Sequence, residues 1–145
     1  MVVFVSDYPT EENQADGMMQ RIAAVDSIFA DQPRLYLKIA FKHYFRPEAR
    51  QQGLVRVERV NFFLHQSRIR RHFRDADCVY VHTVHQVLRA LPQIRRFGKK
   101  TVVDVHGVVP EELAYLGNSV YSRICQRVEA ATLMPGTRSS PWMRR

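Results

Sequence analysis

The sequence predicts one α/β domain in which helices cover both faces of a mostly parallel sheet. Two observations lead to this prediction. Short apolar runs alternate with segments of helical periodicity, which is the pattern of parallel strands joined by helical crossovers. The runs Val2–Ser6 and Cys78–His82 are continuously apolar, as central strands covered on both sides are. A chain of 145 residues is long enough to form one hydrophobic core without disulfides or metals.

The first half of the chain supplies three of the expected strands. After the strand at Val2–Ser6, a polar loop leads to Asp16, which can cap a helix that begins near Gly17. Strands are expected at residues 35–41 and 55–60. The second of these alternates apolar with charged residues, so we expect it at an edge of the sheet.

The second half continues the alternation. A helix is expected at residues 62–74, followed by the strand Cys78–His82. Thr83 can cap the next helix, Pro92 should kink or split it, and Gly98 is suited to end it.

The last expected strand is Thr101–Val105, and a helix capped by Asn118 or Ser119 follows a short helical piece that ends near Gly117. We place the domain at residues 1–133. Residues 134–145 contain two prolines, three arginines and no periodicity, so they are expected to form a disordered basic tail.

The composition limits the function in two ways. The net charge of +8 favours an anionic partner, whether nucleic acid, an anionic membrane surface or a phosphorylated substrate. No apolar run is long enough to span a bilayer and no secretory signal pattern opens the chain, so a cytoplasmic location is expected.

Cys78 and Cys125 lack metal-ligand or redox spacing, which indicates reduced structural thiols.

Candidate site residues follow the ends of the predicted strands. Ligands of open parallel sheets bind beyond the carboxyl ends of the strands, where loops and helix N-termini converge. The most informative segment is Asp104–Glu112. Here His106 can exchange a proton near neutral pH, Asp104 can orient a neighbouring group, and Gly107 permits close backbone approach. A loop histidine satisfied by backbone is the alternative for His106.

Three further motifs have simpler alternatives. Gly17 could begin a phosphate-binding turn, but without a G-x-G-x-x-G or Walker sequence a plain helix start is favoured. His82 and His85 have no evident third ligand nearby, so we favour substrate contact over a metal site. The D-x-D run at Asp75–Asp77 precedes a strand, which places it at the amino end of the sheet, away from the candidate site.

The run V-V-D-V-H-G-V-V-P-E-E-L at residues 102–113, with Gly117-Asn118 and Glu129, resembles the N-terminal domain of GT-B glycosyltransferases, particularly family 4. The resemblance covers about Val2 to Leu133. It implies a three-layer Rossmann-like domain, one half of a GT-B fold, that binds the acceptor while a C-terminal domain binds the nucleotide-sugar donor. The acceptor would be a glycan or a lipid-linked sugar, and neither metal nor another cofactor is expected.

By the same resemblance, His106 would be the catalytic residue near the transferred sugar, and Gly17 and Arg21 would flank the acceptor or a phosphate. We add His82 and His85 to the substrate-binding set because they follow a strand at the same edge. The family continues into a donor-binding domain that this sequence lacks. The chain is therefore expected to be incomplete by itself, either a truncated or frameshifted product that departs near Pro135 or a domain that works with a partner chain.

The basic surface admits two interpretations. Arginines crowd the predicted helix 62–74 beside apolar residues, and they could form a solvated face or a peripheral contact with the inner face of a membrane. The residues concerned are Arg68, Arg70, Arg71 and Arg74, with Phe62, Phe63, Ile69 and Phe73. The alternative function is thus a basic, non-catalytic module for nucleic acid or an anionic surface. No nucleic-acid recognition motif is present, so nucleic acid is not the expected partner. A small enzyme that uses only this domain is a further alternative.

Overall fold

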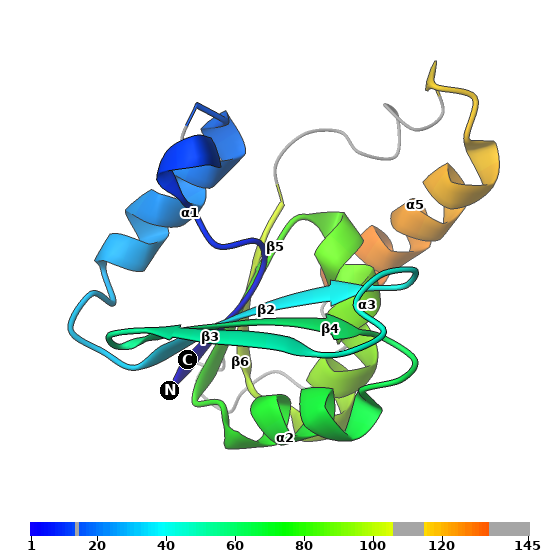
Figure 1. The fold of residues 1–145 in the computed structure, drawn as a ribbon. Helices are drawn as coiled ribbons and strands as arrows, with labels where there is room; N and C mark the ends of the chain where they lie inside the picture. Colours follow the sequence, from blue (N-terminus) through cyan, green and yellow to red (C-terminus); the bar gives the residue numbers. More distant parts are fainter. Residues whose placement is uncertain (14, 106–114, 134–145) are drawn as a thin grey trace, which may run out of the picture. The chain divides into compact units, whose positions relative to one another are not determined.

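The computed structural model describes residues 1–13, 15–105 and 115–133, and the chain divides into two compact units, Met1–Val105 and His106–Arg145 (Figure 1). The described part of the second unit contains the helix α5 (Ser119–Leu133). The elements of the first unit are, in chain order, β1 (Val2–Val5), the 3-10 helix η1 (Glu11–Asn13), α1 (Gly17–Ser27), β2 (Arg34–Ala40), β3 (Glu48–Gln52), β4 (Val55–Asn61), α2 (Gln66–Asp75), β5 (Cys78–His82), α3 (Val84–Phe97) and β6 (Lys100–Asp104).

The six strands form one sheet in the order β3-β4-β2-β1-β5-β6. All neighbours are parallel except β3 and β4, which form an antiparallel hairpin. The five parallel strands, numbered along the chain, therefore stand in the order 3-2-1-4-5, which reverses direction between β1 and β5. This order is consistent with a Rossmann-like fold, and such a reversal is where open α/β sheets bind their ligands. The predicted α/β class with a mostly parallel sheet is confirmed.

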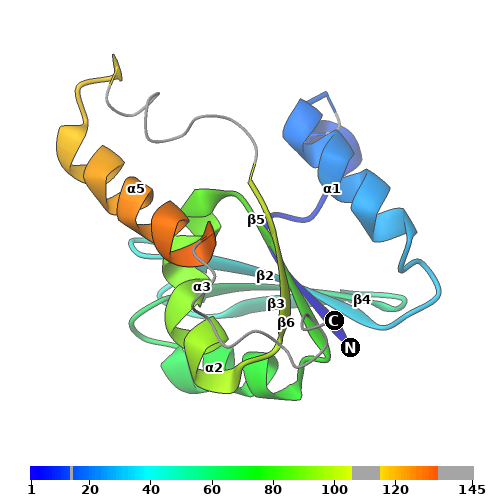
Figure 2. The same ribbon diagram turned by 180° about the vertical axis from the view of Figure 1, so that it is seen from behind.

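Helices cover both faces of this sheet, with α1 on one face and α2 and α3 on the other (Figures 1 and 2). Under α1, the rings of Phe4 and Tyr36 stack with their centroids 4.7 Å apart. Met19 and Ile22 of α1 belong to the same buried cluster, together with Tyr80. The continuous apolar runs of β1 and β5 are thus explained, because their side chains are buried on both faces.

The C-terminal end of α1 is fixed by an ion pair with the start of β2. Arg34 grips Asp26 through two contacts, Nε to Oδ1 at 2.5 Å and Nη2 to Oδ2 at 2.9 Å. The Nη1 group of Arg34 also donates to the carbonyl oxygens of residues 29, 30 and 32 just beyond the helix. These bonds satisfy carbonyl groups that a helix end leaves without intrahelical partners.

Several expectations about local structure are confirmed. Asp16 caps α1 by accepting a hydrogen bond from the Met18 amide, and Gly98 ends α3 in a left-handed conformation. The helix after β4 begins at Gln66 and not near residue 62, because the buried Asn61 side chain holds residues 63 and 64 in a turn.

The structure corrects one expectation and narrows two others. The strand at 55–60 is not an edge strand, because β3 pairs along its outer side. Of the two outcomes expected at Pro92, a kink or a split, the split does not occur, because α3 is continuous from Val84 to Phe97. The apolar residues Ile69 and Phe73 of α2 are fully buried, so they cannot form a membrane-binding face.

A buried carboxylate connects α2 to the sheet. Glu58 of β4 is completely inaccessible to solvent and lies 2.7 Å from Arg68 Nε and 3.0 Å from His72 Nε2, both on α2. Arg56 Nη2 contacts the other carboxylate oxygen at 2.6 Å. Burial by itself raises the pKa of Glu58, but hydrogen bonds from His72 and Arg68 outweigh it and lower the pKa to about 2.

Replacing this carboxylate should destabilise the protein in a pH-dependent way. Because its folded pKa lies below the unfolded value of about 4.5, Glu58 stabilises the fold above that value, and the contribution is lost as the pH falls toward 2. Glu58→Gln should therefore lower the free energy of unfolding at pH 7 by about 3 kcal/mol. Urea denaturation at several pH values should show the difference from the original protein shrinking below pH 4.5.

The matched control is Glu48→Gln, since Glu48 pairs with Arg59 at an exposed site on β3. Its effect should stay below about 1 kcal/mol. A Glu58→Gln effect of the same size at all pH values would contradict the assignment.

Candidate functional site

The candidate site lies where β1, β5 and β6 end at the carboxyl edge of the sheet, next to the reversal in strand order. His82 and Asp104 are the last residues of β5 and β6 and are register partners. Arg21 approaches from α1, and its Nε lies 2.6 Å from Asp104 Oδ2. The Tyr80 hydroxyl donates to the same oxygen, and His82 Nδ1 is 3.6 Å from it. The structure thus brings together three of the residues predicted for the site: Arg21, His82 and Asp104.

The cluster combines a buried acid with an accessible base. Asp104, Tyr80 and His82 are buried, whereas the side chain of Arg21 is 57% exposed. Burial by itself raises the pKa of Asp104, but hydrogen bonds from Arg21 and Tyr80 outweigh it, so the pKa lies below its usual value. Asp104 is therefore ionised at neutral pH. A guanidinium whose direction is fixed by a buried carboxylate, yet which solvent can reach, is suited to bind a phosphate, carboxylate or hydroxyl group.

The backbone between β5 and α3 is strained at this edge. Thr83 has φ 74° and ψ 151°, a region that is essentially restricted to glycine. Its amide donates to the Asp104 carbonyl oxygen at 3.1 Å, which ties the turn to β6. The predicted side-chain cap by Thr83 is wrong, because its hydroxyl makes no capping hydrogen bond. Such strain is characteristic of sites whose geometry is imposed by the surrounding structure.

The positions of Gly17 and His85 give less support to a ligand-binding role. A Cβ on Gly17 would meet no atom within 4 Å, so the described structure gives no steric reason for glycine there. This geometry favours the plain helix start over a close backbone approach to an anion. His85 stands half-buried in the first turn of α3. Among the residues that the structure describes, no group of three or more His, Cys, Asp or Glu side chains is placed to hold a metal ion.

The D-x-D run lies at the opposite, amino edge of the sheet, as its position in the sequence predicts. The Asp77 amide donates to the Met1 carbonyl oxygen at 3.0 Å, and the Asp77 carboxylate contacts the amino group of Met1. Met1 and Asp77, which precede β1 and β5, are therefore connected at the edge of the sheet opposite to Asp104. His106 and Gly107 lie outside the described residues, as does the tail predicted at 134–145.

Tyr80 belongs to the candidate site but was not predicted from the sequence. It precedes His82 by two residues in β5, so both side chains project from the same face of the sheet. A buried tyrosine needs a partner for its hydroxyl. Tyr80 lies two positions before the end of a central strand, so the need for a hydroxyl partner was the sequence signal that could have placed it in the site.

Comparison of the chain with protein-family models, with curated proteins and with solved structures gave no match. In the described part of the chain, no helix combines the length and apolarity that crossing a bilayer requires.

Removing the charge of Asp104 should loosen this edge of the sheet. Asp104→Asn removes the negative charge of the acceptor and weakens its hydrogen bonds with Arg21 and Tyr80, so we expect a loss of about 1–3 kcal/mol in the free energy of unfolding at pH 7. The lowered pKa stabilises the fold above the ordinary carboxyl pKa, so the difference should diminish as the pH falls below that value. Urea denaturation measures both effects. Asp75→Asn, at an exposed carboxylate, is the control and should change stability little.

Glycine at position 83 should relieve the backbone strain. Thr83→Gly is expected to raise the free energy of unfolding by up to about 1 kcal/mol, because the strain removed exceeds the added freedom of the unfolded chain. Thr101→Gly is the matched control in β6, which has ordinary strand geometry, and it should destabilise the protein. If both variants lose stability equally, position 83 is not strained.

Proposed function

We propose that this chain is the acceptor-side domain of a GT-B glycosyltransferase that transfers a sugar from a nucleotide-sugar to an acceptor. The observation that carries the proposal is the Arg21–Asp104–Tyr80 cluster at the point where the strand order reverses. That point is the ligand-binding position of doubly wound sheets. The sequence run that resembles family 4 begins at the same strand, β6, and includes Asp104.

The chemistry of the cluster suits an acceptor sugar or its phosphate. Arg21 offers a fixed and accessible cation for an anionic group or a sugar hydroxyl. Asp104 keeps that cation in place and is itself too buried to be the main contact. The strained turn at Thr83 brings the beginning of α3, with His85 in its first turn, to the same edge. His106, two residues beyond Asp104, is the proposed catalytic residue.

The proposal divides the reaction between two domains. The acceptor would bind at the carboxyl edge of this sheet, and the donor would bind to a second domain in the same protein or in a partner chain. The nucleotide-sugar must meet the acceptor between them, so the described unit alone should bind an acceptor without turning over a donor. Neither a metal nor a cofactor is needed for the role proposed here.

Ligand titration followed by NMR tests the site directly. We expect sugars or sugar phosphates, screened with the 15N-labelled chain, to shift the amide signals of residues 6–8, 82–85 and 104–105. Arg21→Ala should weaken the binding about tenfold, because a charge-assisted hydrogen bond is lost. Arg95→Ala, at an exposed arginine in the last turn of α3, should leave the affinity unchanged.

Three results would contradict the proposal. The first is sugar-dependent shifts confined to the amino edge near Asp77, and the second is an affinity that Arg21→Ala leaves unchanged. The third is tight, salt-sensitive binding of DNA or RNA in the absence of any response to sugars, which would favour a basic nucleic-acid-binding module. The same titration, repeated with UDP-sugars and GDP-sugars, should show no product formation by the chain alone.

A further inference from the structure

A second surface lies at the carboxyl ends of β2 and β4. Ala40 and Asn61 are register partners that end these parallel strands, so the segments 41–46 and 62–64 leave the sheet side by side. Large apolar side chains are exposed on both segments, with Phe45 at 72%, Phe63 at 66% and Leu64 at 59% of their full exposure. We call segments 41–46 and 62–64 together the aromatic patch.

Partly buried hydrogen bonds from one side chain hold the aromatic patch in place. The Asn61 side-chain amide donates to the carbonyl oxygens of Phe41 and His43 at 3.2 and 3.0 Å, and its oxygen accepts from the amides of Phe63 and Leu64 at 2.9 and 3.2 Å. Asn61 is itself buried. One side chain thus fixes both segments, and the exposure of their apolar residues is a property of an ordered surface.

Ring contacts reinforce the same arrangement. Phe41 and Phe62 meet edge to face with centroids 5.2 Å apart, and Phe62 and Phe63 do so at 5.1 Å. The guanidinium of Arg89 lies 5.2 Å from the centre of the Phe41 ring. Tyr44 adopts a left-handed backbone conformation with φ 61°, which is unfavourable for a bulky residue. This strained residue directly precedes the exposed Phe45.

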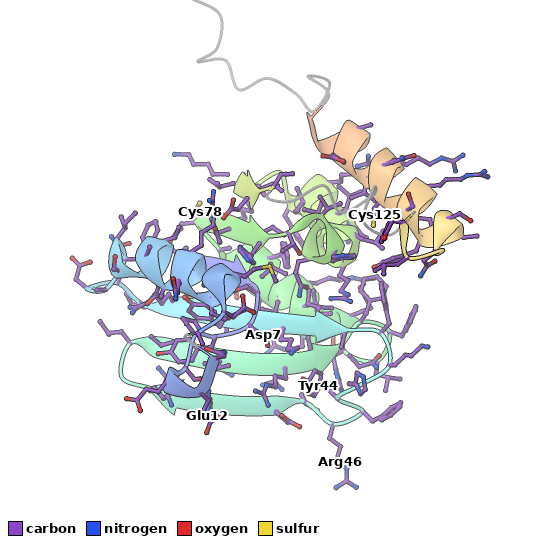
Figure 3. The ribbon with its side chains drawn as sticks, turned by 90° about the horizontal axis from the view of Figure 1, so that it is seen from above. Asp7, Glu12, Tyr44, Arg46, Cys78 and Cys125 are labelled. Carbon is purple, nitrogen blue, oxygen red and sulfur yellow. The ribbon has the colours of Figure 1, made fainter. Side chains whose placement is uncertain are left out.

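The charge beside the exposed apolar residues is positive. Lys42 and Arg46 are exposed on the segment that carries Phe45, and the Arg46 side chain points away from the sheet (Figure 3). Residues 41–47 and 62–65 include no acidic residue. Arg59, on the neighbouring strand, is paired with Glu48 and lies over the Tyr44 ring, so it contributes less free charge.

We infer that the aromatic patch docks onto the surface of an anionic lipid bilayer. Phe45, Phe63 and Leu64 would enter the boundary between headgroups and acyl chains, while Lys42 and Arg46 contact the lipid phosphates. Charge complementarity identifies the occupant. Exposed phenylalanines beside exposed cations match an interface that is apolar below and anionic above. Leu64 argues against single-stranded nucleic acid, because it offers no flat face on which a base can stack.

This surface differs from the membrane contact that the sequence suggested. The arginines of α2 remain, but Ile69 and Phe73, which would have supplied its apolar part, are in the core. Of the four apolar residues expected there, Phe62 and Phe63 belong to the aromatic patch instead. The inference does not rest on the proposed sugar-binding site, whose residues lie at the ends of β5 and β6.

Vesicle co-sedimentation of the full chain tests the docking surface. The chain should bind vesicles of phosphatidylcholine with 30% phosphatidylglycerol and should bind pure phosphatidylcholine vesicles at least about tenfold more weakly. Phe45→Ser combined with Phe63→Ser should reduce binding to the anionic vesicles about tenfold or more. Lys42→Glu combined with Arg46→Glu should do the same and should remove the dependence on salt.

The matched control is Ile28→Ser, because Ile28 is 71% exposed at the far end of α1 and should not affect binding. All four patch substitutions are at exposed positions, so each variant should fold. Circular dichroism and thermal unfolding check this. Equal binding to neutral and anionic vesicles, or binding that both double variants leave unchanged, would overturn the inference. The inference would also be overturned if the chain did not bind vesicles but bound oligonucleotides, and the same double variants abolished that oligonucleotide binding.

Discussion

The sheet of the first unit contains two buried carboxylates, and each one holds a helix of a different layer. On one face, Glu58 pairs with Arg68 and His72 of α2. On the other, Asp104 pairs with Arg21 of α1. An uncompensated buried charge would cost several kcal/mol, so these partners are obligatory wherever the acids are buried. Hydrophobic burial is non-directional, whereas these two contacts, together with the Arg34–Asp26 pair at the end of α1, are directional and fix the position of each helix along the sheet.

The two carboxylates have different surroundings, and the difference favours Asp104 over Glu58 as part of a ligand-binding site. Glu58 is inaccessible to solvent, and it is joined to α2 by Arg68 and His72, whose side chains are 34% and 12% exposed. Asp104 lies at the end of a strand beside a strained turn, and its partner Arg21 is open to solvent. Arg56 beside Glu58 is also partly exposed, but only the Asp104–Arg21 pair stands where the strand order reverses. Position in the topology and accessibility of the partner therefore agree.

The sequence predicted the alternation of strands and helices well, because continuous apolar runs and helix caps are local signals. Asp16 and Gly98 act at their helix ends as expected. The strand β3 was missed because its sequence, E-A-R-Q-Q, is polar and exposed throughout, and only Gly53 with its positive φ indicates the tight turn to β4. A strand without buried side chains leaves almost no trace in the hydropathy pattern of the sequence.

The candidate site was predicted in part for a related reason. Asp104 and His82 could be placed at one edge by counting strands, and Arg21 came from the resemblance. The role of Tyr80 and the strain at Thr83 depend on the register of β5 with β6, which is a long-range property. The aromatic patch likewise depends on Asn61 joining two loops that are about 20 residues apart in sequence.

The hairpin strand β3 has a consequence for solubility. Its five residues are all exposed, and it is held by pairing with β4 and by one exposed ion pair. Segments with so little buried surface open at a lower free energy than the core does. When β3 opens, the valine-rich edge of β4 becomes free to pair with another chain, and such edges are templates for aggregation. Substitutions that weaken this polar strand would therefore promote self-association while the rest of the sheet remained folded.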